Sequence, residues 1–151
     1  MPAQTEAQPD AAPLARPERS WLPLLGLLVG AWAIIPPYVK GFGDLNVESR
    51  VEFADHVLPG VAVLAVSVLG FLLLRSPSPS QTLLFVGGGV ITLAGFWMSA
   101  THAPLVKQYR DDLVVGGAVV WHGLPGLVVT LLGVAWVIRF WGSEDDEASA
   151  G

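Results

Sequence analysis

Two histidines at matching places in the chain are the residues whose type and spacing most suggest chemistry. Each begins the pattern His-x-Leu-Pro-Gly, once at His56 and once at His122. A pair of imidazoles can ligate a metal or a haem iron, or can relay a proton. The sequence therefore offers His56 and His122 as candidate cofactor-binding residues.

A structural role competes with that chemistry. Each histidine stands just before an apolar run, near the expected membrane interface, where polar residues are well tolerated. There the imidazole can bond to a loop carbonyl or to water, while Leu-Pro-Gly forms the helix entry. Haem ligands in four-helix proteins usually lie well inside the bundle, whereas these histidines lie near one end. We favour the structural role and expect no bound cofactor and no metal site.

A third histidine, His102, has no counterpart in the other half of the chain. It follows Thr101 at the expected end of an apolar helix, where a cation is favoured, so we interpret it as part of a solvated helix terminus. Acidic residues near these histidines could bind a divalent cation, but their spacing fits no defined loop, and we expect a solvated surface. These acidic residues are Asp44, Glu48, Glu52, Asp55, Asp111 and Asp112.

The histidine pattern belongs to a longer repeat. The motifs Gly-x-Trp, Pro-x-Val-Lys and His-x-Leu-Pro-Gly occur twice in that order, and the offsets between the copies are 65, 67 and 66 residues. A parallel duplication about an axis along the membrane normal would place the two repeated histidines at similar depth on opposite sides of that axis. The other repeated residues, interpreted as structural, are Gly30, Trp32, Pro37, Lys40, Pro59, Gly60, Gly95, Trp97, Pro104, Lys107, Pro125 and Gly126.

Two features of the repeat have simple physical roles. The two lysines, Lys40 and Lys107, could bind lipid phosphate or an acidic partner, but long basic side chains at a membrane edge usually act as anchors. The glycines allow neighbouring helices to approach closely.

Composition indicates the elements that must position these residues. The chain has 151 residues, of which 52% are hydrophobic and 14% charged. Soluble domains carry about 25% charged residues, so this is a membrane composition. Four apolar stretches, at 21–39, 57–74, 82–104 and 113–138, are near or above the roughly 20 residues that a spanning helix needs. We predict an all-α fold, a four-helix transmembrane bundle made by tandem duplication of a two-helix hairpin.

The predicted organisation has two repeats between two tails. Repeat 1 covers about 21–75 and repeat 2 about 82–141, with a Ser-Pro turn between them; the tails, 1–20 and 142–151, are expected to be disordered. Helices are expected at about 21–35, 55–74 and 82–101, with a short amphipathic piece at 47–53. The last apolar stretch, 113–140, is too long for one perpendicular span, so either it tilts or its part before Trp121 lies in the interface.

Each copy resembles the SPW repeat, a two-helix unit of small prokaryotic membrane proteins. Pro36-Pro37-Tyr38 lies where Ser-Pro-Trp is expected in that family, and Ala103-Pro104-Leu105 is the second match. Trp121-His122 with Gly126 is similar to the family's Trp-Asn step, and Asp55-His56 with Gly60 is the first-copy equivalent. The resemblance covers about residues 20–140. It implies an integral membrane protein and no known reaction.

Several function classes are disfavoured. The chain has no cysteine, which excludes thiolate chemistry and disulfides, and its net charge of −5 disfavours nucleic acid as a partner. No apolar run contains Asp, Glu, Lys or Arg, which argues against an ion-coupled transporter. We predict a non-enzymatic structural or accessory subunit in contact with membrane lipid, which forms a homo-oligomer or binds a membrane-protein partner. The alternatives are a membrane protein that binds a cofactor or metal through histidine, and a small transporter or channel.

The predicted location is the cell membrane, with several spans. An even number of helices places both termini on the same side. Basic residues divide equally between the two sides, so the positive-inside rule does not decide the orientation. We expect cytoplasmic termini, because the connection on that side is very short.

Overall fold

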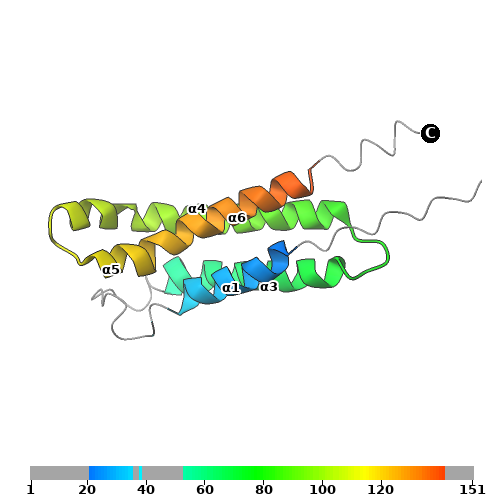
Figure 1. Cartoon of the computed structure of the whole chain (residues 1–151), viewed down its shortest axis with the longest axis horizontal. Helices are drawn as coiled ribbons and strands as arrows, with labels where there is room; N and C mark the ends of the chain where they lie inside the picture. The colour runs from blue at the N-terminus through cyan, green and yellow to red at the C-terminus, as the bar shows by residue number, and fades with distance from the viewer. Residues whose placement is uncertain (1–20, 36–37, 39–52, 142–151) are drawn as a thin grey trace, which may run out of the picture.

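The described part of the chain is a bundle of helices. The computed structural model describes residues 21–35, 38 and 53–141, and within them the regular elements are all helical. Four main helices lie side by side along the long axis (Figure 1). This confirms the all-α, four-helix prediction. In chain order the elements are α1 (Leu22–Ile34), η2 (Phe53–Val57), α3 (Leu58–Leu73), α4 (Gln81–Arg110), α5 (Gly116–Ala118), η3 (Val119–Gly123) and α6 (Leu124–Arg139).

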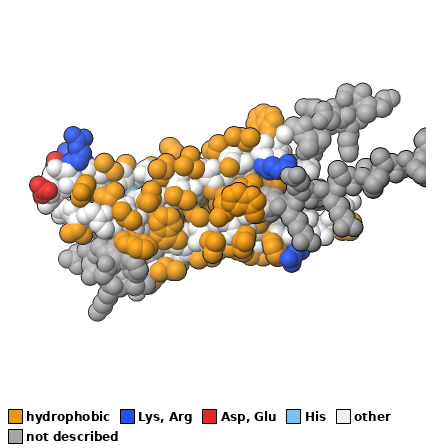
Figure 2. All heavy atoms as spheres, in the orientation of Figure 1, with side chains coloured by type: hydrophobic (Ala, Val, Ile, Leu, Met, Phe, Trp, Pro, Cys, Tyr) orange, Lys and Arg blue, Asp and Glu red, His pale blue; other side chains and the backbone are white. Residues whose placement is uncertain are grey.

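Three helical stretches are long and apolar enough to cross a membrane. They are Phe53–Leu73, Gln81–Arg110 and Gly116–Arg139, and α1 is a shorter apolar helix of 13 residues. Apolar side chains cover most of the visible face between charged groups at its two ends (Figure 2). A face of this kind suits a hydrocarbon surrounding, so length and composition agree with a membrane protein.

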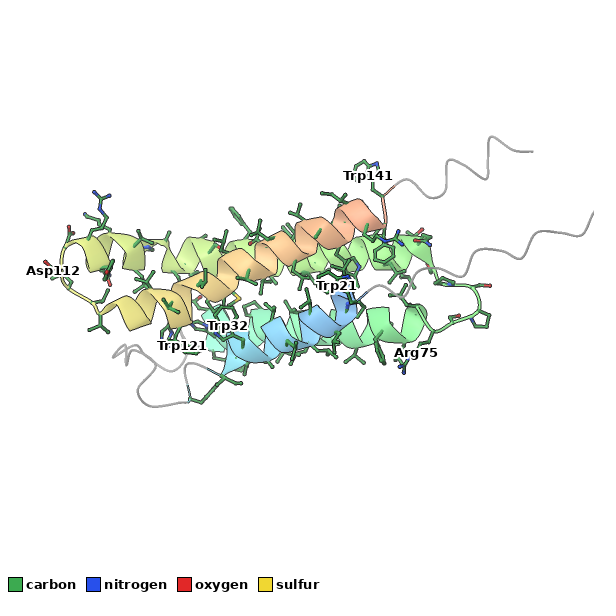
Figure 3. The ribbon with its side chains drawn as sticks, viewed as in Figure 1. Trp21, Trp32, Arg75, Asp112, Trp121 and Trp141 are labelled. Atoms are coloured by element: carbon green, nitrogen blue, oxygen red, sulfur yellow. The ribbon has the colours of Figure 1, made fainter. Side chains whose placement is uncertain are left out.

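The two described ends of the chain lie at the same end of the bundle. Trp21, Trp141 and Arg75 are at one end, and Asp112 is at the other (Figure 3). The α3–α4 turn therefore shares an end with the described termini, as expected for four antiparallel neighbours. The sequence-predicted tails and the piece at 47–52 lie outside the described residues.

Helices α1 and α3 contact each other through glycines. A Cβ at Gly30 would lie 3.2 Å from the Gly60 carbonyl oxygen, and one at Gly60 would lie 3.2 Å from the Gly30 oxygen. A Cβ at Gly26 would collide with the Ser67 hydroxyl. That hydroxyl donates to the Val63 carbonyl oxygen of its own helix at 2.7 Å. The repeated glycines of the first copy are therefore packing residues, as predicted.

Helices α4 and α6 contact each other through two reciprocal Gly–Thr pairs. A Cβ at Gly95 would lie 2.8 Å from the Thr130 Cα, and one at Gly133 would lie 2.7 Å from the Thr92 Cα. Both threonine hydroxyls donate at 2.8 Å to the carbonyl four residues earlier in their own helix. Each helix thus contributes the pattern Thr-x-x-Gly, and the polar atoms at this close contact are hydrogen-bonded.

The third helix is longer than the sequence prediction. Its expected end at Thr101 was wrong, because α4 continues through Pro104 to Arg110. A proline removes one helical hydrogen bond but does not always end a helix, and here the helix continues with one buried side chain beyond it. Leu105, directly after the proline, is 7% exposed. The helical part of the last apolar stretch begins at Gly116 and not at 113. The segment that has to fit within the membrane is therefore three residues shorter at its start than predicted.

A candidate metal site of three histidines

Two π turns carry the repeated histidines. His56 lies in η2 and His122 in η3, and each turn leads directly into an α-helix that has a proline in its first turn. Pro59 and Pro125 have no N–H, and a proline ring clashes with the carbonyl four residues before it. A wider turn relieves that clash, so Leu-Pro-Gly accounts for the local structure at both histidines.

His56 is buried and bonded to a different helix. Its side chain is 1% exposed, and its Nδ1 lies 3.2 Å from the Ala33 carbonyl oxygen of α1. That carbonyl has no α-helical donor, since the residue four positions later is Pro37, which lacks an N–H. A carbonyl only accepts, so the proton of His56 lies on Nδ1 and Nε2 is left as an acceptor.

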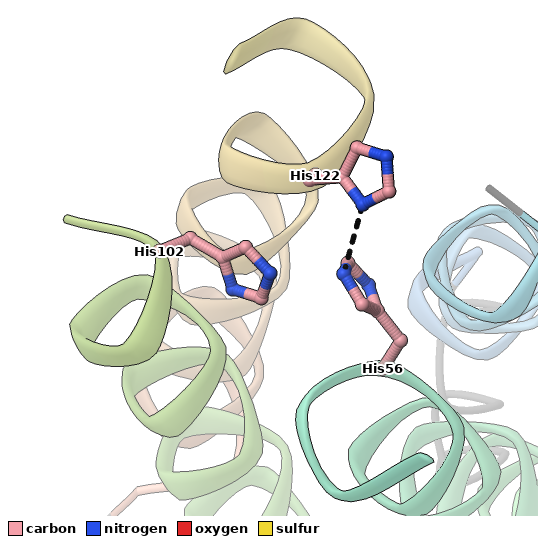
Figure 4. Close-up of side chains that lie close together, drawn as sticks. All are labelled: His56, His102 and His122. Carbon is pink, nitrogen blue, oxygen red and sulfur yellow. Dashed lines mark hydrogen bonds between the residues drawn. The ribbon is translucent and has the colours of Figure 1, made fainter. Parts of the chain in front are cut away.

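His122 faces His56 directly. Its side chain is 3% exposed, and its Nδ1 lies 3.2 Å from the His56 Nε2 (Figure 4). The two ring centroids are 5.1 Å apart. The interpretation of both histidines as interfacial residues bonded to loop carbonyls or water was therefore wrong for His56, whose partners are α1 and His122.

His102 completes the group. It is 9% exposed, and its ring centroid lies 4.5 Å from that of His56 and 6.3 Å from that of His122. Its Nδ1 donates to the Met98 carbonyl oxygen at 2.8 Å, and the Thr101 Oγ1 is 3.0 Å away. The bond to Met98 leaves the Nε2 lone pair free. The interpretation of His102 as part of a solvated helix terminus was wrong, because α4 continues to Arg110.

The chain has three histidines, and all three meet at this place. One ligand nitrogen from each lies within 4.8 Å of the others. No carboxylate among the described residues joins this set: Asp111 and Asp112 are exposed and Asp55 is half-buried. Asp111 and Asp112 thus form the solvated surface that the sequence predicts, and the alternative of a cation site is not formed by the three described carboxylates. Asp44, Glu48 and Glu52 lie outside the described residues.

The third histidine escaped the sequence analysis for an identifiable reason. The offset between the copies rises from 65 residues at Trp32 and Trp97 to 67 at Pro37 and Pro104. His102 falls in that interval, so the two extra residues of the second copy bring it into the helix. The sequence predicts a helix end before Pro104, whereas α4 continues through this proline and keeps His102 inside the helix.

Two buried polar atoms near this part of the bundle lack a hydrogen-bond partner. They are the Trp32 Nε1 and the Ser99 Oγ. Ser99 precedes His102 by three residues, so the two lie on one face of α4, one turn apart. Trp32 precedes Ala33, whose carbonyl oxygen accepts from His56, and it contacts Trp121 edge to face, with ring centroids 6.4 Å apart. Buried polar groups without partners call for an explanation such as a bound water or ion.

The remaining repeat residues have no such role. Lys107 is exposed in the last turn of α4, where an anchor would lie, and Lys40 is outside the described residues. Trp97 is 54% exposed, whereas its partner in the repeat, Trp32, is half-buried. The cofactor candidates are thus the only repeat residues that meet in one polar cluster within the described chain.

Comparison with known proteins gives no family: no protein-family model, no curated protein and no solved structure matches this chain. The resemblance to the SPW repeat stays a prediction. The geometry of the site must carry the functional argument.

Proposed function

We propose that this chain is an integral membrane protein that binds a transition-metal ion through His56, His102 and His122. The observation that supports the proposal is the convergence of three buried imidazoles from three helical segments, with ligand nitrogens within 4.8 Å. Imidazole is the commonest protein ligand for zinc, copper, nickel and iron.

The spacing of two nitrogens is close to that of two ligands of one ion. Nitrogens bound at about 2.0–2.1 Å in tetrahedral geometry lie about 3.3–3.4 Å apart. The His56 Nε2 and the His122 Nδ1 are 3.2 Å apart. A metal ion between them would replace the shared proton, and the ligand nitrogen of His102 lies within 4.8 Å of the other two.

The hydrogen bonds around the rings are those that a metal site needs. Metal-ligating histidines usually donate their second ring N–H to a carbonyl or carboxylate, which fixes the tautomer and the ring orientation. His56 donates to Ala33 and His102 donates to Met98, each through Nδ1. Both rings are therefore held with the Nε2 lone pair available to an ion.

A purely structural role explains less of the site. The bond between His56 and His122 joins the two hairpins, as a polar contact between membrane helices does. It gives no role to the third imidazole, His102, although the centroid of its ring lies 4.5 Å from that of His56. A metal ion satisfies all three rings at once.

The accessory-subunit role predicted from the sequence is compatible with metal binding and remains part of the proposal, as do membrane location and cytoplasmic termini. Gentle extraction followed by native mass spectrometry tests the subunit role. A second polypeptide or a multiple of 16.0 kDa supports it, and a monomer without any partner opposes it.

The test of the metal site uses the full chain, purified in detergent with a tag that contains no histidine. The protein is loaded separately with Zn²⁺, Co²⁺, Ni²⁺ and copper, passed through a desalting column, and its metal content measured. We expect one ion per chain in the wild type, loss in His102→Gln, and retention in Lys107→Gln, which changes an exposed side chain of the same helix. If the folded wild-type protein keeps none of these ions after desalting, the proposal is overturned.

A further inference from the structure

We infer that the ion held by the three histidines is monovalent, and that it is copper in its reduced state. This inference rests on the proposed metal site and specifies its occupant. It follows from the charge of the ligands, from their number and from their burial.

The ligands bring no negative charge. Three imidazoles are neutral when they bind a metal, so the complex keeps the whole charge of the ion. The cluster includes no carboxylate within the described residues, and the chain has no cysteine. The nearest acidic residue in sequence is Asp55, which is half-buried, and the last turn of α4 adds the cations Lys107 and Arg110.

Burial makes this charge expensive. The three histidines are 1%, 9% and 3% exposed, and the helical stretches that carry them are candidate membrane spans. The solvation energy of an ion rises with the square of its charge, so a divalent ion loses about four times as much as a monovalent ion of the same size on leaving water. A site without a compensating anion therefore favours the monovalent ion.

The number of ligands points the same way. Zinc held by three histidines takes a water as its fourth ligand, and divalent copper prefers a tetragonal set of nitrogen and oxygen ligands. The described residues offer three nitrogens in one small group. Monovalent copper has a filled d shell and accepts three ligands without a geometric penalty, and imidazole is among the ligands that suit copper.

The neighbouring hydrogen bonds add to this selectivity. The Nδ1 groups of His56 and His102 donate to main-chain carbonyls, which are neutral, rather than to carboxylates. A carboxylate in that position would lend negative charge to the ring and favour a divalent ion. The hydrogen-bond partners of the His56 and His102 Nδ1 groups are therefore uncharged.

The first experiment compares ions of different charge on the same full-length protein. Separate samples receive Cu⁺ under anaerobic ascorbate, Ag⁺ as a monovalent probe without redox chemistry, and Zn²⁺, each against a chelator of known affinity. We expect one Cu⁺ or Ag⁺ per chain and an X-ray absorption edge typical of reduced copper. The affinity of each ion for the protein is divided by its affinity for free imidazole, and on this scale zinc should bind at least tenfold more weakly than Cu⁺.

The other outcomes separate this inference from the proposed function. Zinc bound as tightly as Cu⁺ on that scale, and lost in His102→Gln, would overturn the monovalent ion and leave the three-histidine site intact. Failure of the folded protein to retain any of the three ions would overturn both.

A pair of variants tests the charge argument itself. The Thr101 Oγ1 lies 3.0 Å from the His102 Nδ1, so Thr101→Asp places a carboxylate beside that ring N–H. We expect the preference to shift toward zinc by about tenfold, the scale of effects seen for groups that hydrogen-bond to ligating histidines. Thr101→Asn has the same shape without the charge and should not shift it. An equal shift in both variants would contradict the charge argument.

Discussion

The hairpin of α1 and α3 and the hairpin of α4 and α6 carry the same motifs but pack their helices differently. In the first hairpin, a Cβ at Gly30 or Gly60 would meet mainly side chains, from Leu64 and Ile34. In the second, a Cβ at Gly95 or Gly126 would meet backbone atoms of the opposite helix. Side chains can move aside and backbone cannot, so the second hairpin is the less forgiving of the two.

The two hairpins also differ in the number of histidines that they contribute to the three-histidine cluster. Each hairpin supplies one histidine from a π turn, and the two rings meet between the hairpins. The second hairpin adds His102, because its first helix is 30 residues long and continues through a proline, whereas α1 has 13 residues. The closely packed pair of helices thus carries two of the three histidines, and the other pair carries one.

The largest expected effect comes from removing one histidine at a time. If the three residues form one site, His56→Gln, His102→Gln and His122→Gln should each weaken metal binding by about 100-fold or more, since each removes a direct ligand. Isothermal titration of the purified full chain measures this. Normal affinity in His102→Gln alone would restrict the site to the repeated pair and remove the asymmetry between the hairpins.

The next effect compares equivalent glycines. A Cβ at Gly126 would lie 2.6 Å from the Ser99 nitrogen, whereas one at Gly60 would lie 2.5 Å from the movable Ile34 Cγ1. We expect Gly126→Ala to lower the free energy of unfolding by about 2 kcal/mol and Gly60→Ala by about 1 kcal/mol. Denaturation in mixed detergents measures both.

Gly89→Ala is the matched control for these variants, because nothing lies within 4 Å of a Cβ at Gly89. It should leave stability unchanged or raise it by up to about 1 kcal/mol, through the higher helix propensity of alanine. Equal losses in Gly60→Ala and Gly126→Ala would show that the two hairpins tolerate side chains alike.

A smaller effect is expected where the two copies touch each other. Gly70 and Trp136 are 66 residues apart and so occupy equivalent places, and a Cβ at Gly70 would lie 2.5 Å from the Trp136 Cζ2. Gly70→Ala should destabilise the wild-type protein, and the same substitution should have a much smaller effect in a protein that already carries Trp136→Leu. A double-mutant cycle should give a coupling of about 1 kcal/mol. Additive effects would mean that this contact does not join the hairpins.

The smallest effect concerns the start of each hairpin. The Ser80 Oγ accepts from the Leu83 N–H at 3.3 Å and caps α4, whereas α1 starts without a side-chain cap. Ser80→Ala should lower the free energy of unfolding by about 0.5 kcal/mol, and Ser80→Asp should preserve it. Thermal unfolding of the three proteins side by side is the measurement. A loss in Ser80→Asp equal to that in Ser80→Ala would indicate that no cap contributes.

Much of the bundle could be predicted from the sequence, because long apolar helices are recognised by their length and by the absence of charged residues. The four apolar stretches followed from these two properties, and the close helix contacts followed from the positions of the glycines. The end of α4 did not follow, since the effect of Pro104 depends on tertiary packing, which here buries Leu105 directly after the proline. A local rule about proline cannot include that contribution.

The candidate site was predicted in part for a similar reason. The repeat singled out His56 and His122, and symmetry suggested that they could face each other. His102 was not recognised, because a comparison of two copies draws attention to what they share and this residue lies where they differ. Its role depends on the helical phase of the residues after Trp97, which only the three-dimensional structure fixes.

The π turns also govern the direction in which each histidine points. Successive residues of an α-helix are about 100° apart around its axis, so one residue more or fewer in a turn rotates everything beyond it by that angle. In η2 and η3 the wide turn sets the angle between each histidine and the glycine face that follows it. Deleting Ala54 or Val120 would keep all three imidazoles in the chain and yet change the direction in which one of them points. A ring that points away from the other two cannot share an ion with them. The meeting of the three imidazoles in this protein is therefore specified by a count of residues as much as by their identity.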